Sequence, residues 1–255
     1  MEQWNAINML VSVMKNDKAI RAIFLKGSWA RGDGDQDSDV DLYCLVHEED
    51  LESFLEKRLY YLRHYQELLY WSEANFVAPQ IVAVFSNGLH LDLYTVTLNT
   101  LQQTDMIKII YDPDNLLADY QGSFFELNPD EVFRLFGSLT FSLLEFEAAY
   151  KRGNVIWASR LASHISGDLI LLLRYVYNPK YAQLGFKKID QHIPKELYRT
   201  LSNAFDRISP SKLPQGLVDL LVILEEIIHK LPAEIRERLN MNFYNFMADK
   251  IRSLN

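Results

Sequence analysis

Two aspartates one residue apart, Asp39 and Asp41, closely follow a Gly-Ser pair formed by Gly27 and Ser28. On an extended strand, side chains at positions i and i+2 point to the same face, so the two carboxylates lie side by side while Val40 faces the core. Two like charges held this closely repel each other. A hard divalent cation such as Mg²⁺ relieves the conflict, because it prefers oxygen ligands and leaves room for substrate phosphates. The aspartate pair therefore predicts a Mg²⁺ site that works on a phosphate-bearing substrate.

The Gly-Ser pair predicts the place where those phosphates bind. An apolar run over residues 22–25 leads into Gly27, and a helix is expected to begin there. Backbone N–H groups without a side chain in the way suit a triphosphate at such a helix start. The Ser28 hydroxyl and a nearby positive charge, Arg31 or Lys26, would add further phosphate contacts. A phosphate cradle beside a metal-binding acid pair indicates nucleotide chemistry.

The same residues resemble the signature of the DNA polymerase β-type nucleotidyltransferase superfamily. The longer run over residues 32–39 is similar to the antibiotic-modifying members, most closely the lincosamide nucleotidyltransferases. The resemblance implies that Asp39 and Asp41 are catalytic metal ligands. It also implies a nucleotide-binding set: Gly27, Ser28, Arg31 and Ser38.

A third carboxylate, required by this chemistry, is predicted at Asp92. This residue alternates with Leu91 and Leu93 on the strand expected after a hairpin turn at Ser86-Asn87-Gly88. Packing alone does not explain a charged side chain on a buried strand. The resemblance implies a third acid at this position, either a metal ligand or the base that takes the acceptor proton. The alternative is an exposed strand residue with no role.

Other polar residues have weaker claims to a function. The resemblance makes Glu145 a candidate general base, against the alternative of a glutamate on a solvated helix face. Arg160 and His164 lie one helical turn apart, and a structural role is favoured for them. The spacing of the aspartates over residues 33–41 does not fit a calcium-binding loop, because the turn-glycine and final-glutamate positions are missing.

Composition limits the partners and the compartment. The 255 residues carry a formal net charge of −8, whereas proteins that bind long nucleic acid normally show a basic stripe. A small acceptor, and in particular a cationic one, fits this charge better.

The single cysteine, Cys44, is expected in the core and makes intramolecular disulfides impossible. The N-terminus has no signal-peptide pattern, and the apolar stretch at 165–177 is too short for a membrane span. A cytoplasmic protein with no membrane partner is expected.

The hydrophobic pattern divides the chain into two parts, which we predict as a catalytic domain at 1–125 and a helical acceptor-binding domain at 126–255. In the first, helices are expected at 2–16 and 48–70, and the aromatic residues around 60–71 mostly in the core. Strands are expected at about 20–26, 39–46, 75–77, 80–85, 89–96 and 108–111. In the second part, the hydrophobic pattern predicts helices at 130–152, 154–177, 193–207, 214–231 and 233–252. The fold class is thus α+β: a nucleotidyltransferase α/β domain with a mixed sheet, followed by a helical bundle.

The sequence therefore predicts a Mg²⁺-dependent nucleotidyltransferase. It would transfer a nucleoside monophosphate, AMP from ATP or another nucleoside triphosphate, to a hydroxyl of a small molecule and release pyrophosphate. The resemblance implies a lincosamide or aminoglycoside antibiotic as acceptor, and a homodimer. Two alternatives remain: a nucleotidyltransferase acting on a protein partner, of the toxin–antitoxin type, and a non-catalytic nucleotide-binding sensor.

Overall fold

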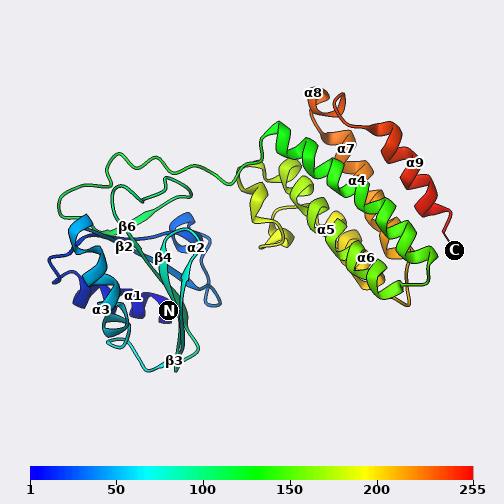
Figure 1. The fold of residues 1–255 in the computed structure, drawn as a ribbon. Helices are drawn as coiled ribbons and strands as arrows, with labels where there is room; N and C mark the ends of the chain where they lie inside the picture. Colours follow the sequence, from blue (N-terminus) through cyan, green and yellow to red (C-terminus); the bar gives the residue numbers. More distant parts are fainter. Residues whose placement is uncertain (255) are drawn as a thin grey trace. The chain divides into compact units, whose positions relative to one another are not determined.

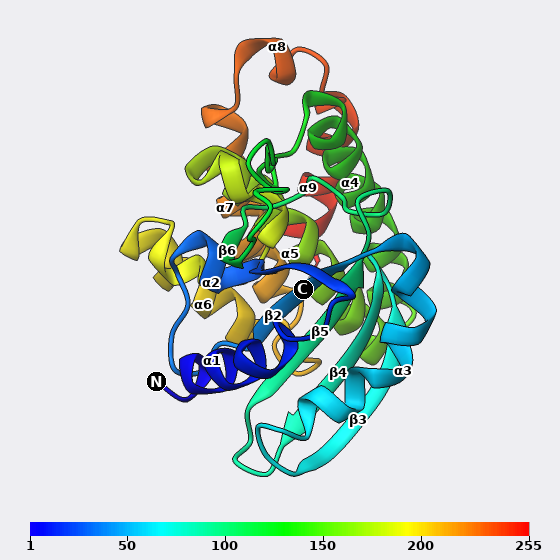
Figure 2. The same ribbon diagram turned by 90° about the vertical axis from the view of Figure 1, so that its left-hand side faces the viewer.

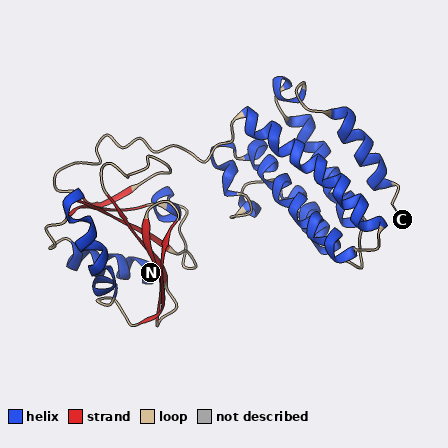
Figure 3. Ribbon diagram, in the orientation of Figure 1, coloured by secondary structure: helices blue, strands red, loops and turns tan. Residues whose placement is uncertain are grey.

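The computed structural model describes residues 1–254, and the chain divides into two compact units, Met1–Phe124 and Phe125–Asn255. Figure 3 shows strands in the first unit and a bundle of helices in the second. The predicted fold class, a mixed sheet followed by a helical bundle, is confirmed.

The first unit is built on one sheet of six strands in the order β3-β4-β5-β2-β1-β6. Strands β2 and β5 pair in parallel, and the other neighbouring pairs are antiparallel. The predicted hairpin between β4 and β5 is confirmed, with Gly88 in the turn at φ 84°. The strands are β1 Ile20–Leu25, β2 Val40–Val46, β3 Leu68–Asn75, β4 Pro79–Phe85, β5 His90–Val96 and β6 Lys108–Tyr111.

Helices α1 (Glu2–Met14) and α3 (Leu51–Leu62) cover one face of this sheet (Figures 1 and 2). Val40, Leu42 and Cys44 of β2 point into the core under these helices, as their alternation predicted. The Cys44 side chain is fully buried, and burial raises the pKa of its thiol far above the usual range, which fits a core residue.

The opposite face of the sheet carries the odd-numbered side chains of β2, and a smaller core lies there. Tyr43 stacks between Phe24 and Tyr94, with ring centroids 5.1 and 4.3 Å apart, respectively. Ala22, Leu45, Val96 and Leu117 complete this second core. Asp41 and Asp92 therefore lie on strands that are packed on both faces, at the ends where β2 and β5 begin.

The prediction of a helix through residue 70 is wrong. A short 3-10 turn, Glu48–Asp50, leads into α3, which ends at Leu62, and Tyr70 lies on β3. Strand β3 is an edge strand on which every residue is half-buried or exposed, so it shows no clear alternation with buried residues. Tyr61 and Tyr65 are in the core as predicted, but Tyr60, Tyr70 and Trp71 are exposed.

The second unit is a helical bundle in which α4 and α5 pack along each other and α7 and α9 close a common apolar core. The predicted helix over 233–252 is wrong, because the chain leaves the helical path after α8. The Asn240 side chain accepts a hydrogen bond from the Phe243 N–H and starts α9 as a new helix. The α-helices are α4 Pro129–Lys151, α5 Val155–Tyr177, α6 Lys195–Arg207, α7 Gln215–Lys230, α8 Ala233–Arg236 and α9 Met241–Arg252, with 3-10 turns at Pro179–Leu184 and Ile189–Gln191.

Helix α5 is longer than the apolar stretch at 165–177 suggested, so the sequence argument from length against a membrane span is wrong. With 23 residues and an 18-residue window of mean hydropathy 1.2, it is the one helix within residues 1–254 that is long and apolar enough to cross a membrane. Its apolar side chains, among them Leu161, Ile165 and Leu169, pack in the core of the helical bundle. Such burial is also typical of a core helix.

Glu147 supplies a testable link between two helices of the bundle. Its nearly buried carboxylate accepts hydrogen bonds from Lys151 of α4 at 2.6 Å and Lys250 of α9 at 3.2 Å. The bond from Lys151 holds the pKa of the carboxyl below its usual 4.5. A lowered folded-state pKa adds stability that is present above about pH 4.5 and is lost as the pH falls further.

We therefore expect Glu147→Gln to lower the free energy of unfolding by about 1–2 kcal/mol at pH 7. The difference from the unmodified chain should shrink towards zero below pH 4.5. Urea unfolding of both proteins at several pH values measures it, with the exposed Glu145→Gln as the matched control. A difference that stays constant down to acid pH would contradict a role for the charge.

Candidate active site

Asp41 and Asp92 lie directly opposite each other on neighbouring strands. The parallel register of β2 and β5 pairs Asp41 with Asp92 and Leu42 with Leu93. Register partners project to the same face of a sheet, so both carboxylates leave the face that carries Tyr43 and Tyr94. Two predicted catalytic acids, 51 positions apart in the chain, are thus brought together by strand pairing.

Asp39 joins this pair through His90. The His90 ring lies between two carboxylates, with Nε2 3.2 Å from Asp92 Oδ1 and Nδ1 3.9 Å from Asp39 Oδ2. The Asp39 side chain is 43% exposed and that of Asp92 is 13% exposed. The three predicted acids and His90 therefore occupy adjacent positions at the start of β2 and β5.

Burial raises the pKa of the Asp92 carboxyl, the negative charge of Asp39 raises it further, and His90 opposes both. Tyr94, the next residue on the same face, also has a raised pKa, first because of burial and then because of the charge of Asp41. Negative charge is thus crowded at the ends where β2 and β5 begin.

Gly27 lies against the Asp41 carboxylate. It begins the short helix α2 (Gly27–Arg31) with φ 66°, a left-handed conformation that suits glycine. A Cβ atom added to Gly27 would lie 2.1 Å from Asp41 Oδ2, so the close approach requires the absence of a side chain. The predicted phosphate turn and the predicted metal ligand are therefore direct neighbours.

The two serines of the predicted nucleotide site have different surroundings. The Ser28 hydroxyl oxygen is buried and has no hydrogen-bond partner among the described residues. The Ser38 hydroxyl donates to Asp35 Oδ1 at 3.0 Å and accepts from the Asp35 N–H at 2.9 Å. Ser38 thus closes the loop before Asp39, whereas Ser28 keeps an unused hydroxyl next to Gly27.

Of the two basic residues beside the turn, Lys26 is buried and Arg31 is half-buried. The Lys26 ammonium donates to the carbonyls of Gln102 and Thr104, and burial lowers its pKa to about 8. Arg31 Nη1 donates to Asp105 Oδ2 at 2.7 Å. Both positive charges thus face residues Gln102 to Asp105, called here the 102–105 segment, and Arg31 Nε also lies 3.6 Å from Asp33 Oδ1.

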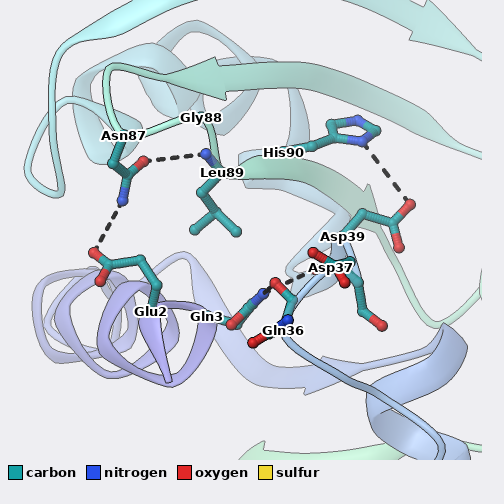
Figure 4. Close-up of a pocket in the computed structure, with 10 residues that line it drawn as sticks. Glu2, Gln3, Gln36, Asp37, Asp39, Asn87, Gly88, Leu89 and His90 are labelled. Carbon is teal, nitrogen blue, oxygen red and sulfur yellow. Dashed lines mark hydrogen bonds and ion pairs between the residues drawn. The ribbon is translucent and has the colours of Figure 1, made fainter.

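A pocket of about 460 Å³ opens beside the ends where β2 and β5 begin (Figure 4). Asp39 and His90 form one side of it, and Glu2 of α1 lies opposite, where it accepts a hydrogen bond from Asn87 at 2.9 Å. Asp37 adds a third carboxylate to the lining. No lysine or arginine of the described chain lines the pocket, so it favours a neutral or cationic ligand.

The carboxylates suit a hard divalent cation in their chemistry, although residues 1–254 contain no group of three or more His, Cys, Asp or Glu positioned to hold a metal ion. Magnesium is commonly held by one or two carboxylates together with substrate phosphates and waters, and not by an all-protein cage. The neighbouring Asp41 and Asp92, with Asp39 beside them, match that donor set in type.

Glu145, the candidate general base, lies on α4 in the helical unit, where it is exposed. Arg160 and His164 are exposed on α5. The structure therefore brings Gly27, Asp39, Asp41 and Asp92 together in the first unit, and it places Glu145, Arg160 and His164 in the second.

Two residues next to the predicted site were missed by sequence reasoning. His90 had a usable signal, because it stands two positions before Asp92 and so shares its face. Asp105 had none: it lies in an irregular segment, 78 positions from Gly27 and 74 from Arg31, and only the folded chain joins them.

Residues 8–83 match the family model described as "Polymerase beta, Nucleotidyltransferase". This match lies within the first unit and supports the predicted enzyme class, a nucleotidyltransferase. The matched range includes Gly27, Ser28, Asp39 and Asp41 and ends before Asp92. The finer resemblance to lincosamide nucleotidyltransferases has no counterpart in this match.

Three solved structures are similar to the chain along most of its length. An aminoglycoside 6-adenyltransferase from Bacillus subtilis is 13% identical, with 98% of each chain covered and a TM-score of 0.40. A nucleotidyltransferase-like protein from Exiguobacterium sibiricum 255-15 is 15% identical, with 90% of this chain and 76% of that chain covered and a TM-score of 0.36. A GLD-2/RNP-8 complex is 13% identical, with 91% and 71% covered and a TM-score of 0.33. Curated protein sequences give no significant match.

Proposed function

We propose that the chain transfers a nucleoside monophosphate, AMP from ATP, to a hydroxyl group of a small molecule and releases pyrophosphate. One observation carries this proposal. Gly27 lies against the Asp41 carboxylate, and Asp41 is in register with Asp92 on the same face of the sheet. A triphosphate held at the Gly-Ser turn would have its phosphates beside the carboxylates. That arrangement suits the transfer of a nucleotidyl group from the triphosphate.

In this reaction the acceptor hydroxyl oxygen forms a bond to the α-phosphorus, and the bond from that phosphorus to the bridging oxygen of pyrophosphate breaks. Asp92, whose pKa is raised by burial, is suited to take the hydroxyl proton. Gly27 and Ser28 would orient the β- and γ-phosphates. Asp39 and Asp41 would hold Mg²⁺, with Asp92 as a third ligand if it is not the base, and the ion would supply positive charge to offset the charge on the leaving pyrophosphate.

The acceptor is proposed to be small and cationic. The chain's net charge of −8 and the pocket lined by Glu2, Asp37 and Asp39 support an amino-bearing molecule. The sequence resemblance favours an aminoglycoside or a lincosamide as its chemical class.

Pyrophosphate release from ATP and Mg²⁺, measured against a panel of aminoglycosides and lincosamides, tests the proposal. Release that depends on one acceptor, with the acceptor gaining the mass of AMP, would support it. ATP binding without release across the panel would favour a nucleotide sensor, and a labelled protein in place of a drug would favour a protein acceptor.

Ser28 gives an independent test, because its hydroxyl has no partner in the described protein. Removing an unsatisfied buried hydroxyl should leave stability unchanged or raise it by up to about 1 kcal/mol. If the hydroxyl contacts a phosphate, Ser28→Ala should also weaken ATP binding about 10-fold, the loss expected for one hydrogen bond to a charged group. Calorimetric titration with ATP and thermal unfolding measure the two effects.

The matched control is Ser12→Ala, an exposed serine whose hydroxyl already donates to the Met9 carbonyl at 2.7 Å. It should not change ATP affinity. Unchanged ATP affinity in both variants would remove Ser28 from the proposed nucleotide site.

A further inference from the structure

The 102–105 segment holds three residues in and around the Gly-Ser turn: Lys26, Gly27 and Arg31. The Lys26 ammonium donates to the carbonyls of Gln102 and Thr104, each at 2.9 Å. The Gly27 N–H donates to Asp105 Oδ2 at 3.2 Å, and Arg31 Nη1 donates to the same oxygen at 2.7 Å. One carboxylate oxygen therefore ties together the first and last residues of α2.

Asp105 is itself held rigidly. It is 6% exposed, and its φ of 65° lies in the left-handed region that non-glycine residues rarely adopt. Its Oδ1 accepts from the Met106 N–H at 2.7 Å, and its own N–H donates to the Ser123 carbonyl. A Cβ atom on Gly122 would lie 2.1 Å from the Asp105 carbonyl oxygen, so Gly122 allows the close approach.

A strained, buried residue persists only where its surroundings hold it, and such residues gather at functional sites. Here the Asp105 carboxylate contacts Gly27 and Arg31 of the turn, while the Asp105 backbone is held by Tyr120 and Ser123. The Asp105 carboxylate neutralises Arg31, whose side chain is 9% exposed, and fixes the direction of the Gly27 N–H. Buried opposite charges paired in this way define one geometry for the groups they connect.

We propose that Asp105 is a positioning residue for nucleotide binding, which acts on the triphosphate through Gly27 and Arg31. The proposal rests on the function proposed above, because it requires that the Gly-Ser turn contacts the nucleotide. Asp105 sets the orientation of this turn beside Asp41. Without it, the turn samples other orientations and ATP binds more weakly.

Two substitutions separate the carboxylate from the backbone. Asp105→Gly removes the carboxylate and relieves the left-handed strain, and Asp105→Asn keeps an oxygen acceptor but removes the charge. Asn115→Gly is the matched control, because Asn115 is an exposed residue with a φ of 56°. The affinity of the full chain for ATP with Mg²⁺ is measured by calorimetry well below the unfolding temperature of each variant.

We expect Asp105→Gly to weaken ATP binding about 10-fold or more, since it removes both contacts to the turn. Asp105→Asn should show a smaller loss, and Asn115→Gly should show none. If Asp105→Gly does not fold, Arg31→Lys breaks the same pair from the other side and should weaken binding in the same direction.

Folded Asp105 variants that bind ATP as tightly as the unmodified chain would overturn the positioning role and leave the proposed function standing. Tighter binding would also overturn it, because Asp105 would then compete with the phosphates for Gly27 and Arg31. If the unmodified chain does not bind ATP, the proposed function fails, and the role of Asp105 fails with it.

Discussion

Asp41→Asn is expected to reduce acceptor-dependent pyrophosphate release by about 1,000-fold or more, because the charge at the centre of the proposed site is lost. Asparagine has nearly the same shape as aspartate, so the fit against Gly27 is retained while one negative oxygen is replaced by an amide. Asp39→Asn should have an effect of similar size, since Asp39 lies beside Asp92 across the His90 ring. Initial rates at saturating ATP, Mg²⁺ and acceptor measure both.

The control is Asp119→Asn, the same change at an exposed aspartate of the first unit. It should keep full activity. All three variants should have similar thermal stability, so that a rate difference reports on chemistry and not on folding. An Asp39→Asn or Asp41→Asn enzyme that keeps more than about a tenth of the normal rate would contradict the roles proposed for these carboxylates.

The chemistry-bearing part of β2 was readable from the sequence because its alternation is regular. Val40, Leu42 and Cys44 are apolar, and Asp39 and Asp41 stand between them, so the face of each residue follows from a period of two. The turn at Gly27 and Ser28 was also readable, because a Gly-Ser pair after the apolar run at 22–25 indicates the end of a strand and a tight turn.

What the sequence did not contain is the pairing between distant segments. Asp92 was predicted from its alternation and from a resemblance, but its register opposite Asp41 depends on a parallel pairing that only the folded sheet defines. Asp105 depends on an irregular segment whose position is set by Lys26 and Gly122, so no local pattern marks it.

The errors in secondary structure have local physical causes. Strand β3 lies at the sheet edge, and its exposed Leu69, Tyr70 and Trp71 do not alternate with buried residues, so the sequence has no alternation there that separates β3 from the helical pattern of α3. The break before α9 did have a signal. Asn240 is a favourable N-cap, and sequence reasoning passed over it because apolar residues continue at helical spacing on both sides.

Gly27→Ala is the second substitution for which we expect a large effect. The new Cβ would lie 2.1 Å from Asp41 Oδ2, and the Asp41 side chain is the group that must move. A displacement of this kind misplaces a charge that the proposed reaction needs, and misplacements of about 1 Å can cost about 100-fold in rate. The left-handed backbone adds about 1–2 kcal/mol of destabilisation. We therefore expect a folded but less stable protein whose pyrophosphate release falls about 100-fold or more.

Gly32→Ala separates these two effects. Gly32 ends the same short helix with φ 85°, so alanine there should cause a similar loss of stability, yet no described atom lies within 4 Å of the position that its methyl group would take. Only Gly27→Ala brings a methyl group against Asp41. Thermal unfolding should therefore show similar losses for the two variants, while pyrophosphate release should be low only in Gly27→Ala. Equal activity in the two would mean that the room beside Asp41 is not needed for catalysis, and that Gly27 serves the turn alone.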